Sequence, residues 1–137
     1  MGEGKEGSMP RAVQFSVALD NTAGTLAKLC AALRRARVNI DAVSVCDNRD
    51  CVWVRMLLRP AARARAALHK ARYTVCAQLV LTVEAPDRPG ELERIAARLA
   101  RKGVNINYLY GSTPPGAGST LVLSVSDVDR ALTALGE

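Results

Sequence analysis

The sequence has few of the residues that catalytic sites and RNA-binding surfaces most often use. Aromatic residues make up 4% of the 137 residues, and His69 is the only histidine. With one histidine no nucleophile–base pair can be recognised, and no glycine-rich nucleotide-binding fingerprint is present. No apolar run approaches the roughly 18 residues of a membrane-spanning helix. We therefore expect neither an enzyme nor an integral membrane protein.

Cysteine is present, but not in the spacing of a metal site. The four cysteines are Cys30, Cys46, Cys51 and Cys76, and no paired C-x-x-C motifs occur. A zinc site is therefore not expected, and no other metal or cofactor is expected either. Cys30 falls on the apolar stripe of a predicted helix, where packing is the usual role of cysteine. A disulfide between Cys46 and Cys51 would form only on oxidation.

The N-terminus carries no apolar signal core. Its first ten residues, MGEGKEGSMP, are rich in glycine and charge, a composition typical of disordered segments. We therefore expect residues 1–12 to form a disordered tail and the protein to be cytoplasmic.

Positive charge is concentrated in one part of the chain. The sequence has 19 basic and 13 acidic residues, a formal net charge of +6. Residues 27–72 alone hold eleven basic and three acidic side chains. Such a segment suits an anionic partner, although a solvated helix face is the commoner explanation.

The chain contains one unit twice, at an offset of 66 residues. The segment DNTAGTLAKLCAALRRARVNIDAV (20–43) aligns with PDRPGELERIAARLARKGVNINYL (86–109). The identical pairs are Gly24/Gly90, Leu26/Leu92, Ala31/Ala97, Leu33/Leu99, Arg35/Arg101, Val38/Val104, Asn39/Asn105 and Ile40/Ile106. So many matches in register exclude coincidence and indicate two similar domains.

Each unit shows the same order of predicted elements. An alternating strand (14–20 or 79–85) precedes a turn, a helix with an apolar stripe, two further strands and an Ala-rich helix. The first unit ends in another strand near 73–76, for which the second unit has no counterpart. We predict an α+β fold of two ferredoxin-like β-α-β-β-α-β units packed side by side, the second lacking its last strand. The predicted domains are residues 13–77 and 78–137.

The turn before the first helix is the most informative part of each unit. Gly24 and Gly90 mark a point where the backbone bends tightly or approaches another group closely. The helix start offers unpaired N–H groups that suit a carboxylate, and Asn21 or Asp87 precedes it. Two interpretations are open. Asn21 and Asp87 contact a ligand, or they cap their helices, with Pro89 at the first helical position.

A second pair of polar residues begins the next strand of each unit. The amides of Asn39 and Asn105 both donate and accept hydrogen bonds, so a helix start and two amides can hold both ends of a free amino acid. The alternative is that each Asn only forms the turn between helix and strand, because Asn tolerates the left-handed conformation.

These motifs resemble those of the ACT domain, a small ligand-binding regulatory module. Its hallmark is D-x-P-G-x-L at the first helix, followed by G-x-N-I. The second unit has DRPGEL (87–92) and GVNI (103–106), and the first has NTAGTL (21–26) and RVNI (37–40). The first unit departs from the pattern at Ala23 and Arg37. The resemblance covers residues 13–135 and is closest to small stand-alone tandem ACT proteins.

The resemblance implies the β-α-β-β-α-β fold, pairing of domains side by side, and an amino acid bound where two domains meet. Carried over by position, the ligand-binding residues are Asn21, Gly24, Leu26, Asn39, Ile40, Asp87, Gly90, Leu92, Asn105 and Ile106.

We therefore expect a non-enzymatic regulatory module that binds a small ligand, expected to be an amino acid, and forms a homodimer through the open edge of the second unit. The alternative is an RNA-binding module that uses the basic first unit, because the RNA-recognition fold has the same element order. That fold displays aromatics on its central strands. Here the segment CVWVRMLL (51–58) has one aromatic and STLVLSV (119–125) has none.

Overall fold

The computed structural model describes residues 11–112 and 118–136. These residues form two compact units, which we describe separately: the first unit is residues 13–78, and the second is residues 79–136 together with Arg11 and Ala12. The expected disordered tail, residues 1–12, lies outside the described residues up to residue 10, whereas Arg11 and Ala12 belong to a strand. Residues 113–117 also lie outside the described residues.

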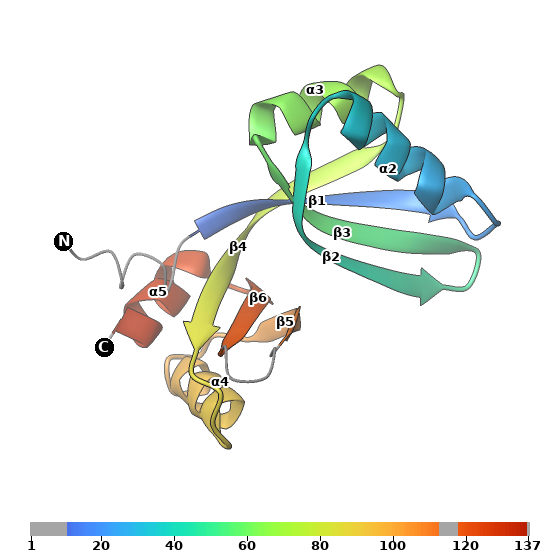
Figure 1. Ribbon diagram of the computed structural model, residues 1–137. Coiled ribbons are helices and arrows are strands. Elements are labelled where there is room, and N and C mark those ends of the chain that lie inside the picture. Colours follow the sequence, from blue (N-terminus) through green and yellow to red (C-terminus); the bar gives the residue numbers. More distant parts are fainter. Residues whose placement is uncertain (1–10, 113–117, 137) are drawn as a thin grey trace. The chain divides into compact units, whose positions relative to one another are not determined.

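The first unit has the predicted β-α-β-β-α-β order (Figure 1). Its elements are β1 (Arg11–Asp20), α2 (Thr25–Arg35), β2 (Asn39–Asn48), β3 (Cys51–Arg59), α3 (Ala61–Lys70) and the first residues of β4 (Val75–Ala85). Strand β3 pairs antiparallel with β1 and with β2, so that Val54 lies opposite both Val17 and Val45. A bulge in β2 lies between Ile40 and Ala42.

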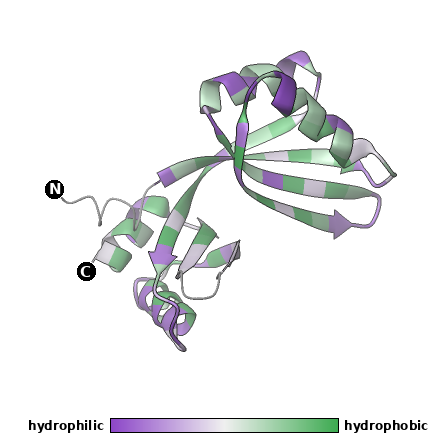
Figure 2. Ribbon diagram, in the orientation of Figure 1, coloured by the Kyte–Doolittle hydropathy of each residue, from purple (hydrophilic) through white to green (hydrophobic). Residues whose placement is uncertain are grey.

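Helices α2 and α3 cover one face of this sheet (Figure 1). The strands show the predicted alternation of hydrophobic and hydrophilic residues along their length (Figure 2). The core joins that face to the apolar stripes of both helices, and its buried residues are Phe15, Val17, Leu19, Leu29, Leu33, Val38, Val54, Met56, Leu58, Ala64 and Leu68. A stripe of this kind holds an amphipathic helix on a sheet by burying its apolar side chains.

The second unit repeats the arrangement with β4, α4 (Glu91–Arg101), β5 (Ile106–Ser112), β6 (Ser119–Val125) and α5 (Val128–Gly136). Strand β6 pairs antiparallel with β4 and with β5. Its buried core is also formed by apolar residues: Leu81, Val83, Ala85, Ile95, Leu99, Val104, Leu123, Val125, Ala131, Ala134 and Leu135. The guanidinium of Arg11 pairs with Asp129 of α5, which ties the start of β1 to this unit.

Three of the helices end in the same backbone motif. After α2, the N–H of Val38 donates to the Leu33 carbonyl (3.0 Å) and the N–H of Arg37 donates to the Arg34 carbonyl (2.9 Å). These two bonds define a Schellman motif, in which the residue after the helix takes the left-handed conformation. That residue is Arg37 (φ 59°) after α2, Arg72 (φ 66°) after α3 and Gly103 (φ 72°) after α4.

Candidate functional site

The turn before α2 has a defined geometry that explains its sequence. The N–H of Thr25 donates to the Thr22 carbonyl (3.4 Å), and Gly24 lies between them with φ 92° and ψ −11°. These angles, with no positive φ at Ala23, are those of a type II turn, whose third residue must be left-handed. Gly24 is therefore required by the turn itself, because only glycine adopts this conformation without strain.

The turn before α4 has the same hydrogen bond and nearly the same glycine backbone angles. The N–H of Glu91 donates to the Arg88 carbonyl at 3.4 Å, and Gly90 has φ 90° and ψ −3°. Pro89 stands at the second turn position, which favours proline in a type II turn. The prediction that Pro89 is the first helical residue is therefore wrong: α4 begins at Glu91.

Neither polar residue before these helices acts as a cap. Gly24 and Gly90 occupy the cap positions of α2 and α4, and neither helix start has a side-chain cap hydrogen bond. The capping interpretation of Asn21 and Asp87 is wrong, since the type II turn moves both residues upstream of the cap. Both side chains are exposed. The N–H groups at both helix starts are therefore available to donate hydrogen bonds to a ligand carboxylate.

The first helical residue stabilises the turn in both units, but the interactions differ between the two units. The hydroxyl of Thr25 donates to the Asp20 carbonyl (2.9 Å) and the Thr22 carbonyl (3.1 Å). At the equivalent position, the Glu91 carboxylate accepts from the guanidinium groups of Arg94 (2.9 Å) and Arg88 (2.8 Å). Arg94 and Arg88 lower the pKa of Glu91 below its ordinary value. The start of α4 therefore already holds a paired carboxylate, whereas the first turn of α2 has no acidic residue.

Open space and apolar surface adjoin both turns. A Cβ atom added at Gly24 or Gly90 would meet no described atom within 4 Å. The predicted site residues Leu26 and Leu92, which the sequence also places on the apolar helix stripes, are 39% and 46% exposed. They lie at the helix starts, beyond the cores, and so provide an apolar wall next to the free N–H groups.

The two asparagines of the predicted site differ in their surroundings. The Asn105 side chain donates to Asn107 Oδ1 (3.0 Å), and its backbone N–H donates to Ser126 Oγ (3.0 Å). In the part of the chain that the structure describes, the exposed Asn39 side chain has no hydrogen-bond partner. Neither asparagine has a positive φ, because Arg37 and Gly103 make the left-handed turns. The turn-forming interpretation of these asparagines is therefore wrong.

Asn39 and Ile40 share an open cavity of about 410 Å³ beside the C-terminal half of α2. The other residues that line this cavity are Cys30, Leu33, Arg34, Arg37 and Val38. Asn21, Gly24 and Leu26 are not among them, because they lie at the opposite end of the helix. Eleven residues at 1.5 Å each separate the two groups by about 16 Å. One small ligand therefore cannot contact both groups of a single unit.

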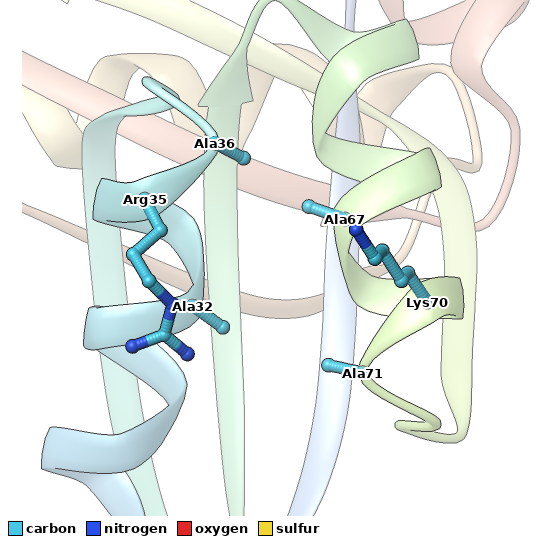
Figure 3. Close-up of a pocket in the computed structure, with 6 residues that line it drawn as sticks. All are labelled: Ala32, Arg35, Ala36, Ala67, Lys70 and Ala71. Atoms are coloured by element: carbon cyan, nitrogen blue, oxygen red, sulfur yellow. The ribbon is translucent and has the colours of Figure 1, made fainter.

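A second feature of the first unit was missed by sequence reasoning. An open groove of about 330 Å³ lies between α2 and α3, where Ala32 and Ala36 point toward Ala67 and Ala71 (Figure 3). Arg35 and Lys70 flank it, and neither has an ion pair among the described residues. The sequence feature that could have predicted this groove is the pair of alanines four residues apart on each helix. At the aligned positions the second unit has Arg98, Lys102 and Thr133 in place of the first three alanines.

Groups of metal-ligating type do not cluster in the part of the chain that the structure describes. All four cysteines are free. Cys46 lies opposite Trp53, and Cys51 lies opposite Asn48, so the two cysteines are diagonal neighbours rather than a directly opposed pair. Among the described helices, none combines the length and apolar character needed to cross a membrane.

Comparison with known proteins identifies the repeat. A family model described as the ACT domain pair matches residues 11–135. A crystal structure of a protein from Bacteroides thetaiotaomicron superposes with a TM-score of 0.87 and 25% sequence identity, covering 93% of this chain and 88% of that one. No curated protein sequence matches the chain.

Two further crystal structures share the fold at lower identity. The regulatory subunit of aspartate kinase from Thermus thermophilus, in a ligand-free form, has a TM-score of 0.67 and 14% identity over 94% of this chain and 97% of that one. The same subunit from Thermus flavus has a TM-score of 0.64 and 15% identity over 94% and 95%.

Proposed function

Because the chain belongs to the ACT domain pair family, we propose that it is a non-enzymatic regulatory module that binds a free amino acid where two ACT units meet. The observation that carries the proposal is the repeated type II turn, which presents uncapped helix N–H groups beside open space in both units. Proteins of the same fold are named as regulatory subunits of aspartate kinase, which supports a regulatory role.

The turn residues and the asparagines recognise different ends of the ligand in this proposal. The N–H groups at the start of α2 or α4 bind the carboxylate, as helix N-termini bind anions generally. The Asp87 carboxylate or the Asn21 amide oxygen accepts from the ammonium group. Asn39 and Asn105 supply a further amide from a second unit. Four apolar residues, Leu26, Leu92, Ile40 and Ile106, enclose the ligand side chain.

The length of α2 supports a site shared between two units. Because about 16 Å of helix separates Asn21 from Asn39, the turn of one unit must meet the asparagine of another for both to touch one ligand. We propose that the units pack side by side for this reason. The second unit, in this proposal, has no last strand of its own, and its open edge pairs in a homodimer. A light-scattering mass equal to a single 14.6 kDa chain at micromolar concentration would contradict the dimer.

Thermal melts with each of the twenty amino acids test the function directly. Ligand at about a hundred times its dissociation constant should stabilise the protein by about 2.7 kcal/mol, a rise of several degrees in Tm for a chain of this size. The Asn39→Ala/Asn105→Ala double variant should lose the shift produced by the interface ligand. Asn48→Ala, at the far end of β2, is the matched control and should keep it. If no amino acid shifts the wild-type melt at millimolar concentration, the proposed function is wrong.

The concentration of cations in residues 27–72 is the observation that favours the alternative, an RNA-binding module. If these cations form only a solvated face, binding to a single-stranded RNA pool should be weak and should vanish near physiological salt. Binding that persists at such salt with a preference for one sequence would favour the RNA-binding alternative.

A further inference from the structure

A third cavity in the first unit lies next to the turn before α2. It has a volume of about 260 Å³ and lies between the end of β1, the first turns of α2 and the residues that follow α3. Its lining residues are Ala18, Leu19, Asp20, Thr25, Lys28, Ala71, Arg72 and Tyr73. The volume lies just below the range of about 300–1,000 Å³ typical of drug-sized ligands, which suits a small metabolite. We call it the Asp20–Arg72 cavity.

The charged residues of this cavity carry both signs. Asp20 is acidic, and Lys28 and Arg72 are basic. Among the described residues, none of the three takes part in an ion pair, with one another or with a neighbour. Asp20, Lys28 and Arg72 are all exposed, so their charges lie around the rim of this open cavity. Two cations and one carboxylate in this arrangement complement a ligand that carries two carboxylates and one ammonium group.

Backbone hydrogen bonds fix the main chain of two of these residues. Asp20 ends β1, and its carbonyl accepts from both the Thr22 N–H (2.9 Å) and the Thr25 hydroxyl (2.9 Å). Arg72 is the left-handed residue of a Schellman motif, with φ 66°, and its N–H donates to the His69 carbonyl (3.0 Å). An arginine at a position that favours glycine costs conformational energy.

The second unit does not repeat this set of charges. The residues aligned with Asp20, Thr25 and Lys28 are Pro86, Glu91 and Arg94. Proline removes the carboxylate, and the Arg94 guanidinium is already bound to Glu91 at 2.9 Å. The charge pattern is therefore a property of the first unit and not of the repeat.

We propose that the Asp20–Arg72 cavity binds an amino acid with an acidic side chain. One ligand carboxylate pairs with Lys28 and the other with Arg72, while the ammonium group pairs with Asp20. The site is separate from the proposed interface site, because none of its lining residues is among Asn21, Gly24, Leu26, Asn39 and Ile40. L-asparagine and L-glutamine have nearly the same shape as the acidic ligands but leave one cation unpaired, so they bind more weakly.

Isothermal titration of the full chain with L-aspartate, L-glutamate, L-asparagine and L-glutamine tests the proposal. The acidic ligands should bind about tenfold or more tightly than the amides, as expected from loss of one charge-assisted bond. Lys28→Met and Arg72→Gly should each weaken the acidic ligands by a similar factor. Arg72→Gly keeps the left-handed backbone, so a loss of binding in this variant does not come from misfolding.

Arg49→Gly is the matched control. Arg49 also has a positive φ (64°), is exposed, and lies in the turn between β2 and β3, outside this cavity. Binding of the acidic ligands should be unchanged in Arg49→Gly and in the Asn39→Ala/Asn105→Ala variant. Equal binding of acids and amides, or equal affinity in Arg72→Gly and Arg49→Gly, would overturn the inference. Acid binding that is lost in the Asn variant and kept in Arg72→Gly would also overturn it, while supporting the interface site.

Discussion

Arg37 and Gly103 occupy the same position of the repeat and adopt the same left-handed backbone, with φ values of 59° and 72°. Both donate to the helix carbonyl three residues earlier, at 2.9 Å and 3.0 Å. The ACT pattern has glycine at this position, so the first unit keeps the turn while carrying a side chain that the turn disfavours. This difference between the repeats leads to a direct test.

Replacing Arg37 with glycine should stabilise the protein. The left-handed conformation costs a residue with a side chain about 1 kcal/mol, so Arg37→Gly should raise Tm by about 4 °C. Gly103→Ala should lower Tm by a similar amount, since an added Cβ would have room, 3.8 Å from the Arg130 guanidinium, and only the backbone cost remains. Scanning calorimetry of both variants checks the pair. Equal melting points for Arg37→Gly and wild type would contradict the expected strain.

The turn before α2 offers a second stabilising change. Ala23 and Pro89 occupy the same position of matching type II turns. Ala23→Pro should stabilise the protein by about 0.4–1 kcal/mol, because proline restricts the unfolded chain at a position already suited to it. Pro89→Ala should destabilise it by a similar amount. Urea denaturation of the two variants should give shifts of opposite sign, and shifts of the same sign would contradict the shared turn geometry.

Gly111 is a position where close approach, and not backbone conformation, requires glycine. An added Cβ would lie 2.3 Å from the Thr120 carbonyl oxygen and 2.8 Å from Leu121 Cδ2 on the paired strand β6. Gly111→Ala should therefore force β5 away from β6 and cost about 1–3 kcal/mol. Gly136→Ala, whose added Cβ would meet no atom of the described residues within 4 Å, is the control and should change the unfolding midpoint very little.

Stability should fall at acid pH in part through Glu91. Arg94 and Arg88 lower the pKa of its carboxyl below the ordinary value of 4.5, so the unfolded chain binds this proton more readily than the folded one. The stabilisation of the folded state by the ionised Glu91 carboxylate is fully present above pH 4.5 and is lost as pH falls through the lower pKa of the folded state. Urea midpoints measured from pH 6 to pH 3 should fall less steeply in Glu91→Gln than in wild type. Glu93→Gln, which removes a carboxylate without a described ion pair, should follow wild type.

The element order of both units could be predicted from sequence because the same pattern occurs twice, at an offset of 66 residues. Where one copy was ambiguous, such as the Arg37 turn, the other copy had the clearer residue, Gly103. Strand alternation and the apolar stripe around Leu29 and Leu33 predicted the buried face correctly, because apolar residues recur at the strand or helix period on the side that packs against the core.

The helix starts and the sites were harder to predict, for physical reasons. Asn21 and Asp87 are residues that often cap helices, but a type II turn places glycine at the cap instead. Spacing put Leu26 and Leu92 on the apolar stripes, yet both lie one turn beyond the cores. The Asp20–Arg72 cavity is lined by residues more than fifty positions apart in the chain, and a local sequence pattern cannot predict that such residues lie close together.

Strands β1 and β4 each cross the boundary between the two units, β1 after Ala12 and β4 after Gln78. Cutting the chain at either place would divide a strand instead of a linker, so we expect that neither half expressed alone would keep all of its strands intact.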